Sequence, residues 1–445
     1  MSRDGGGQDA NNLSFMVRAL RHRNYRLFFC GQIVSLVGTW MTRVATSWLV
    51  YRLTGSPFLL GLVGFAGQIP SFLLAPFAGV LVDRWNRHRL LVVTQILAML
   101  QSAALGALAL GGIIQLWHVL VLSLFQGLIN AFDMPGRQAF VVEMVERRED
   151  LSNAIALNSS MVNAARLLGP SIGGIVIAAV GEGWCFLGDA ISYIAVIASL
   201  LLMRVVPRAA RPAREARVLA SLREGFTYVS RNAPIRSILL LLALVSLVGM
   251  PYTVLMPVFA SRILHGGPHT LGFLMAATGV GALTGAVFLA GRRSVLGLGR
   301  VIPFTAGLFG AGLIGFSLSR TMWLSVPLLL VTGLGFMVQM ASSNTLIQTL
   351  VDDDKRGRVM SFYTMAFMGT TPFGSLLAGS LADRIGAPHT LLLGGIGCVV
   401  GAVAFAVLLP RLREKVRPIY IRMGILPEVA DGLRSAAQLT TPPQT

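Results

Sequence analysis

Twelve long apolar segments follow one another along this chain of 445 residues, and each is long enough to cross a membrane. A membrane-spanning helix needs about 20 apolar residues. Backbone groups inside hydrocarbon must pair within the segment, and the alternation of barrel strands is absent, so each segment is predicted to be a helix. The expected spans are 27–52, 58–82, 90–111, 116–138, 153–180, 184–204, 236–262, 271–290, 300–319, 322–350, 361–384 and 388–410.

The charged residues of the chain are few and unevenly placed. Only 13% of residues are charged, whereas a soluble domain carries about 25%. The net charge is +18, but the arginines lie between apolar segments rather than on one soluble face, which argues against nucleic-acid binding. If the N-terminus and every second loop are cytoplasmic, the cytoplasmic side contains 31 of the 37 Lys and Arg residues. This positive-inside pattern places both termini in the cytoplasm.

The longest polar break divides the chain into two similar parts. Residues 138–146 and 344–352 align, and each follows the fourth span of its half. Two six-span repeats are a known transporter architecture with the substrate site between the halves. The sequence therefore predicts an all-α membrane protein with twelve transmembrane helices in two pseudo-symmetric six-helix halves. The expected divisions are a cytoplasmic segment 1–26, a half 27–204, a linker 205–235 ending in a short surface helix, a half 236–410 and a cytoplasmic tail 411–445.

The loop after the second span carries a recognisable pattern. It contains Gly79, Asp83, Arg84, Arg87 and Arg89. This pattern resembles the signature loop of the major facilitator superfamily. The resemblance implies that Asp83 meets the cytoplasmic N-terminus of span eleven in one conformation only, where the helix dipole favours a negative charge, and so acts as a gating latch. The alternative is that these charged residues only set the membrane topology of the chain.

Span five carries a second pattern, which consists of Arg166, Gly169, Pro170, Gly173 and Gly174. It resembles the Gly-Pro motif of major facilitator exporters. Proline removes a backbone donor and kinks the helix, and glycines let a neighbouring helix approach. Generic helix packing is the alternative reading of these small residues. The export direction depends largely on this motif.

The loop before span eleven contains Arg356, Gly357 and Arg358, and with its surroundings it is similar to the branch of enterobactin exporters and macrolide-efflux-like proteins. The resemblance covers residues from about 20 to 412 and implies a location in the bacterial inner membrane. A second copy of the signature pattern includes Asp383 and falls outside the cytoplasm, because about 50 residues separate the flanking basic loops. If Asp383 were cytoplasmic, the helix count would be wrong by one.

Polar side chains recur at helical spacing inside spans one, four and ten. A polar stripe within hydrocarbon should face a water-filled cavity or the bundle interior. A charge at the bilayer centre costs about 3 kcal/mol, so such a residue suggests a use. The candidates for substrate binding or proton coupling are Arg43, Asp133, Asp189, Gln32, Gln126, Asn130 and Gln339. Arg43 is expected to bind an anionic or catecholate substrate or to form a structural pair, and the two acids to carry a proton or to form ion pairs.

These features predict a secondary transporter that exports small amphipathic molecules, such as siderophores or drugs, by alternating access with proton coupling. No enzyme activity is expected: neither lysine belongs to a Walker A motif, so the chain is no ATPase, and matches to other enzyme motifs lie inside apolar helices. No cofactor or metal ion is expected. The expected partners are membrane lipids, a small-molecule substrate and protons, without nucleic acid, and the expected state is a monomer. An importer and a non-transporting membrane receptor or scaffold remain alternatives.

Overall fold

The computed structural model describes residues 18–145, 147–204, 218–292, 294–352 and 355–422. At positions 75, 76, 79, 80, 83, 84, 148 and 218–222 only the backbone is described. All regular structure in these ranges is helical. The first half consists of η1 (Arg18–Arg21), α2 (Arg23–Thr54), α3 (Pro57–Arg84), α4 (Arg87–Leu110), α5 (Leu116–Met144), η2 (Arg148–Asp150), α6 (Leu151–Val180) and α7 (Glu182–Leu201).

The second half begins after the undescribed residues 205–217. It consists of α8 (Val218–Arg231), α9 (Ala233–Leu244), η3 (Val245–Gly249), α10 (Tyr252–Val258), η4 (Phe259–Ile263), α11 (Pro268–Ala290), α12 (Leu298–Leu318), α13 (Met322–Leu350), α14 (Arg356–Thr364), η5 (Met365–Gly369), α15 (Thr371–Ile385) and α16 (Ala387–Arg422). Helix α8 is the short surface helix expected at the end of the linker.

Eleven segments among the described residues are long and apolar enough to cross a membrane. The remaining span is the eleventh in chain order, Arg356–Ile385, in which the wide turn η5 separates α14 from α15. The seventh span is interrupted in the same way before Pro251, where the N–H of Met250 reaches back five residues to the carbonyl of Val245. A proline cannot donate the usual helical bond to the residue four before it, so a wider turn absorbs the defect. The twelve-helix fold is confirmed, and the interruptions were not predicted.

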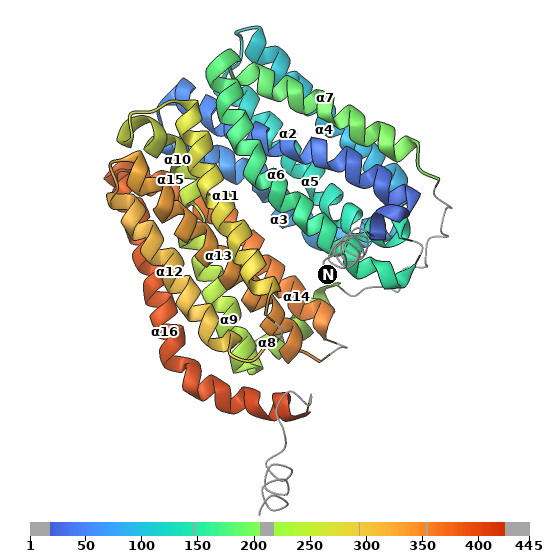
Figure 1. The fold of residues 1–445 in the computed structure, drawn as a ribbon, viewed down its shortest axis with the longest axis vertical. Coiled ribbons are helices and arrows are strands. Elements are labelled where there is room, and N and C mark those ends of the chain that lie inside the picture. The colour runs from blue at the N-terminus through green and yellow to red at the C-terminus, as the bar shows by residue number, and fades with distance from the viewer. Residues whose placement is uncertain (1–17, 146, 205–217, 293, 353–354, 423–445) are drawn as a thin grey trace, which may run out of the picture.

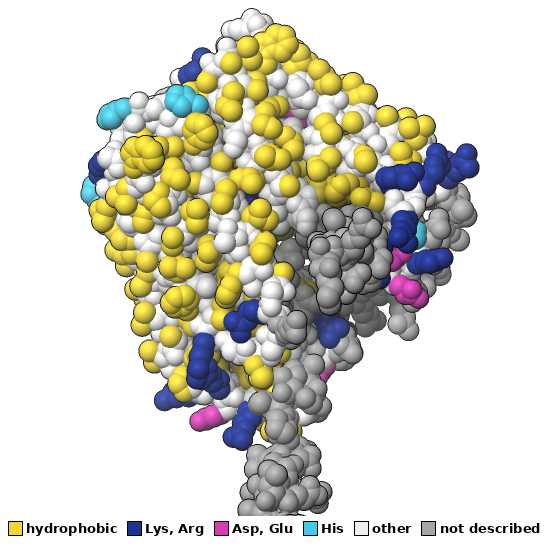
Figure 2. Space-filling model, in the orientation of Figure 1, with side chains coloured by type: hydrophobic (Ala, Val, Ile, Leu, Met, Phe, Trp, Pro, Cys, Tyr) yellow, Lys and Arg dark blue, Asp and Glu magenta, His cyan; other side chains and the backbone are white. Residues whose placement is uncertain are grey.

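Most helices end within a few residues of the expected limits, but α16 does not. It continues past residue 410 to Arg422, through Pro410 and Pro418. Figure 1 shows this last part turning beneath the second half. Figure 2 shows hydrophobic side chains over most of the visible face, with Lys and Arg gathered along its lower and right-hand edges. An apolar belt with basic margins is the surface that a bilayer requires.

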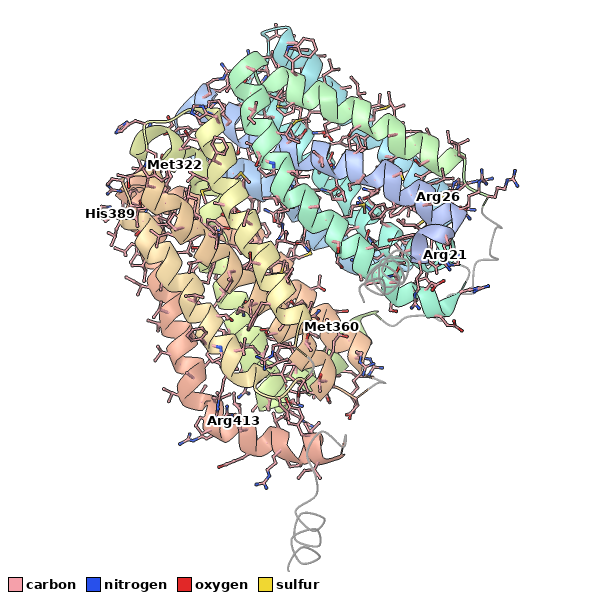
Figure 3. All side chains as sticks on the ribbon, in the orientation of Figure 1. Arg21, Arg26, Met322, Met360, His389 and Arg413 are labelled. Carbon is pink, nitrogen blue, oxygen red and sulfur yellow. The ribbon has the colours of Figure 1, made fainter. Side chains whose placement is uncertain are left out.

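The two ends of the helix bundle differ in charge. We call the end that contains Arg87, Arg300 and Arg356 the basic end, and the end that contains Gly55 and Arg262 the far end. Figure 3 shows Arg21, Arg26 and Arg413 toward the basic end and Met322 and His389 at the far end. Asp383 lies at the far end, because its carboxylate approaches Ser56 at the start of α3.

The two halves touch closely at the far end. A Cβ added to Gly61 of α3 would lie 2.5 Å from the carbonyl oxygen of Ser375 and 3.0 Å from the Cα of Gly379, both on α15. A Cβ added to Gly174 of α6 would lie 2.8 Å from the carbonyl oxygen of Pro268 at the start of α11. Glycine is required at such backbone approaches. From these crossings the halves diverge toward the basic end (Figure 1).

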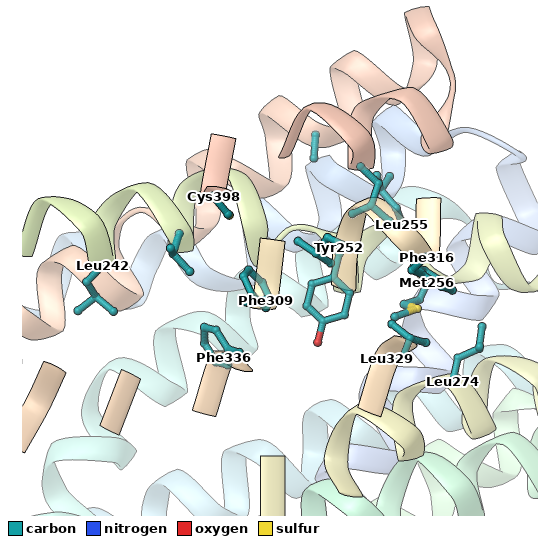
Figure 4. Packing of buried hydrophobic residues seen from close by; sticks show 14 of the residues in the cluster. Leu242, Tyr252, Leu255, Met256, Leu274, Phe309, Phe316, Leu329, Phe336 and Cys398 are labelled. Atoms are coloured by element: carbon teal, nitrogen blue, oxygen red, sulfur yellow. The ribbon is translucent and has the colours of Figure 1, made fainter. Parts of the chain in front are cut away.

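Aromatic side chains fill the core of the second half (Figure 4). The rings of Tyr252 and Phe309 meet edge to face with centroids 6.1 Å apart, and Phe336 packs on Phe309 at 5.5 Å. All three are buried. This packing joins the broken seventh span to α12 and α13 and fixes the position of Tyr252.

Candidate functional site

Two arginines of the first half share one indole ring. The guanidinium carbon of Arg43 on α2 lies 4.5 Å from the centroid of the Trp40 ring, and that of Arg166 on α6 lies 5.0 Å from it. Arg43 is exposed although it lies near the middle of α2, which requires open space beside it. The Nε of Arg166 is buried and has no hydrogen-bond partner in the part of the chain that the structure describes. Neither guanidinium forms an ion pair with any described residue.

This arginine pair lies beside the second half. The backbone at Arg166 and Leu167 would be 3.2–3.5 Å from a Cβ at Gly279 of α11, so α6 and α11 are in close contact here. Arg166 also lies near Tyr252 of α10. The two positive side chains therefore lie where the halves meet, at the depth of the middle of the spans.

Asp189 on α7 is buried in the first half, with 3% of its surface exposed. Its Oδ2 accepts hydrogen bonds from the hydroxyls of Thr42 on α2 and Ser102 on α4, both at 3.0 Å. Its Oδ1 has no hydrogen-bond partner within the described ranges. Among the described residues no cation pairs with this carboxylate. Hydroxyl donors alone offset only part of the cost of burying an ionised acid.

Asp133 on α5 has a different environment, although it is equally buried. Arg137, one helical turn later, forms an ion pair with its Oδ2. Thr94 and Gln95 of α4 donate hydrogen bonds to its Oδ1 at 3.0 and 2.7 Å. The Asp133 carboxylate is thus charge-compensated and fully bonded within the first half.

The remaining polar candidates are less exposed than Arg43. Gln32 is 3% exposed and Gln339 is 0% exposed, so both side chains are packed inside their halves. Gln126 and Asn130 are half-buried, and the amide of Gln126 donates to Asn130 at 3.1 Å. The structure brings Arg43 and Arg166 together on the ring of Trp40. Asp189 contacts Thr42, the residue before Arg43. No contact is described between the four amides and the two arginines.

The glycines of the span-five motif have separate neighbours. A Cβ at Gly169 would lie 2.5 Å from the Cβ of Trp40, and one at Gly173 would lie 3.0 Å from Met41. These two glycines therefore hold α6 against the part of α2 that carries Trp40. Gly174 instead faces α11 at the crossing between the halves. Pro170 lies inside α6 and is buried between these contacts.

The loop motifs lie at the basic end. Arg87 pairs with Glu143 at 2.6 Å, and Arg89 is exposed on the first turn of α4. The side chains of Gly79, Asp83 and Arg84 lie outside the described part of the structure, so the latch stays a prediction.

In the loop before span eleven, Arg356 begins α14 and Gly357 is exposed. Arg358 pairs with Glu224 of α8 at 2.8 Å. The basic loop before span eleven is thus tied to the helix at the end of the linker.

At the far end, side chains join the halves across the closed face. Arg262 donates a hydrogen bond to the carbonyl oxygen of Gly55 at 2.9 Å and lies over the ring of Tyr51. The hydroxyl of Ser56 contacts Asp383 at 3.4 Å. Both contacts run between α2 or α3 and the second half, so they can form only when the far end is closed.

Sequence reasoning missed several residues of this arrangement. Trp40 precedes Arg43 by three positions, which places the two side chains on one helix face and is a usable signal. Thr42, Ser102 and Tyr252 carry no comparable signal, because each acquires its role through helices distant in the sequence.

The arrangement of the helices is the fold of the major facilitator superfamily. A bacterial homologue of the human lysosomal transporter Spinster, in an inward-facing and occupied conformation, superimposes with a TM-score of 0.68 at 15% identity, over 88% of this chain and 98% of that one. The family model described as transmembrane secretion effector matches residues 16–419. The chain belongs to this family of the major facilitator superfamily and is an efflux-type transporter.

Named relatives extend over nearly the whole chain. The staphyloferrin A transporter of Staphylococcus aureus is 25% identical over 393 residues, which covers 88% of this chain and 97% of that protein. The multidrug efflux pump Tap of Mycolicibacterium fortuitum is 28% identical over 388 residues, which covers 85% of this chain and 93% of that protein. These names identify transporters of different substrates.

Proposed function

We propose that this protein exports small organic molecules across the bacterial inner membrane by alternating access, driven by the proton gradient. The positive-inside pattern makes the basic end cytoplasmic. The crossings at the far end close the outer side, and the halves diverge toward the cytoplasmic side. This is the conformation in which an exporter takes up its substrate. The relatives named above support the direction.

The observation that carries proton coupling is the environment of Asp189. It is a buried carboxyl group that pairs with no cation among the described residues, whereas Asp133 pairs with Arg137. A buried acid without a cationic partner is costly to hold in its ionised form, and a proton removes that cost. Asp189 is therefore the group that we assign to the coupling proton, and Asp133 is assigned a structural ion pair.

The position of Asp189 suggests how the proton acts on transport. Its hydrogen bond to Thr42 ties α7 to the residue next to Arg43 on α2. A Cβ at Gly38, one turn earlier on α2, would lie 2.7 Å from the Oδ1 of Asp189. Gain or loss of a proton changes the hydrogen bonds of this contact, and α2 carries Trp40 and Arg43 at the meeting of the halves. Proton and substrate thus act on one helix.

The test uses inside-out vesicles that contain the full chain. Export appears as uptake of probe into these vesicles, and an importer would give no such uptake. The probes are citrate, erythromycin and ethidium, which are anionic, weakly basic and cationic. We expect Asp189→Asn to abolish accumulation driven by the proton gradient while probe exchange at equal concentrations continues. Glu182→Gln is the matched control, because Glu182 is a buried acid of the same helix that pairs with Arg52. Gradient-driven accumulation by Asp189→Asn at the wild-type level would refute the assignment.

A further inference from the structure

Two positive charges at one place inside the spans need an explanation. A single charge at the bilayer centre costs about 3 kcal/mol. Here the charges of Arg43 and Arg166 are close enough to repel one another, which adds to that cost. The Trp40 ring offsets part of it through cation–π contacts, each worth about 0.5–2 kcal/mol. An aromatic ring stabilises a guanidinium but does not neutralise it, so the pair keeps its net charge.

The acids of the first half do not neutralise the pair either. Asp133 is bound to Arg137, and Glu182 is bound to Arg52. Asp189 faces Thr42 and Ser102 and makes no described contact with either arginine of the pair. Within the part of the chain that the structure describes, two guanidinium groups therefore remain available to a ligand.

The geometry of the pair limits the ligand. Each guanidinium offers a planar fork that fits a carboxylate with two parallel hydrogen bonds. Both forks lie within 5.0 Å of the Trp40 centroid, so a small molecule can span them. The exposure of Arg43 shows that one fork is accessible from the open space, and the unpartnered Nε of Arg166 shows that the other retains an unused donor.

From these observations we infer that the site takes organic anions with two or more oxyanion groups, such as polycarboxylates or catechol carboxylates, and excludes permanently cationic drugs. This inference rests on the proposed function, because it assumes that the space beside Arg43 belongs to the transport path. A cation placed there meets two like charges without a counterion, which costs several kcal/mol. A dianion neutralises both arginines at once.

An anion bound here also contacts the region where the halves must rearrange. Arg166 is close to Tyr252, and α6 packs on α11 beside it. An anion paired with Arg166 adds a charged group beside this contact between the two halves. Binding of an anion therefore changes the surface between the two halves, which is the surface that opens and closes during alternating access.

Binding to the purified full chain in nanodiscs tests the inference. The probes are citrate, its neutral trimethyl ester, 2,3-dihydroxybenzoate and ethidium, and binding is followed by tryptophan fluorescence. We expect the anions to bind and the ester and ethidium to bind at least tenfold more weakly. Arg43→Gln and Arg166→Gln should each raise the Kd of citrate at least tenfold. Arg43→Lys keeps the charge but not the fork, so it should recover part of the affinity.

Arg26→Gln is the matched control, since Arg26 is an exposed arginine at the basic end of the same helix. Its citrate affinity should equal that of the wild type. The melting temperature of each variant separates loss of the site from loss of the fold. If Arg43→Gln does not fold, the Kd of citrate for Arg43→Lys is compared with that of the wild type instead.

Three results would overturn the inference: no binding of either anion, a citrate affinity in both Gln variants equal to that of the wild type, or ethidium binding as tight as citrate binding. Transport of ethidium by wild type in the vesicle test, without citrate binding, would leave the exporter function standing and remove only the anion site. Arginine-dependent citrate binding without uptake of any probe would leave the anion site and remove the export function.

Discussion

The closure of the far end depends on glycines, and Gly61 provides the sharpest test of it. In Gly61→Ala the new methyl group would lie 2.5 Å from a backbone oxygen of α15, a distance that real Cβ atoms do not adopt. Helix α15 would have to move away from α3, and overpacking of this kind costs about 1–3 kcal/mol. The clash exists only while the far end is closed. The ratio of outward-open to inward-open molecules should therefore rise about 5- to 150-fold.

A matched substitution separates this effect from helix propensity. Alanine is favoured over glycine in any helix by about 1 kcal/mol. Gly67 lies on the same helix α3, but a Cβ there would be 3.8 Å from its nearest neighbour, Ser123 of α5. Gly67→Ala therefore gives the propensity gain without the clash, and we expect its conformational equilibrium to match that of the wild type.

The assay measures the separation of the halves at the far end. Spin labels are attached at Trp117 and Trp323, which are 57% and 92% exposed, in a chain whose native cysteines Cys30, Cys185 and Cys398 are replaced by serine. Double electron–electron resonance should show a new, longer distance in Gly61→Ala only. If the distributions of Gly61→Ala and Gly67→Ala coincide, the glycine crossing does not control closure, and the reasoning fails.

Three further outcomes follow from the contacts. Asp133→Asn should lower unfolding stability by about 1.5–3 kcal/mol, because Arg137 loses its acid, and adding Arg137→Gln should restore part of the loss in thermal unfolding. Arg262→Gln should lengthen the same spin-label distance by removing a contact between the halves; an unchanged distribution would contradict this. The hydrogen bond from His22, and then the nearby positive charge, hold the pKa of Asp150 below its usual range, so this contact should stabilise the fold fully above about pH 4 and weaken as pH falls through the lowered pKa. In His22→Asn the pKa of Asp150 is lowered less, so the loss of melting temperature on acidification should be smaller and should be complete at a higher pH.

The helices could be predicted from the sequence because hydrocarbon permits few alternatives. A long apolar segment must pair its own backbone groups, so it is predicted to be a helix. The basic loops predict which end of each helix faces the cytoplasm. The same physics made Arg43 and Asp189 candidates for substrate binding or proton coupling, since a charge inside a span is costly. The pairing of Asp133 with Arg137 was also within reach, because the two residues are four apart on one helix.

Only the tertiary structure decided which of these residues meet. Arg166 joins Arg43 on the Trp40 ring because Gly169 allows α6 to lie against α2, and this packing depends on the whole helix surface rather than on a local pattern. The closed far end was equally out of reach. A transporter has one sequence and at least two conformations that differ by a few kcal/mol. The sequence alone determined the helices and their charges, and packing between helices distant in the chain decided which side chains meet and which end of the bundle is closed.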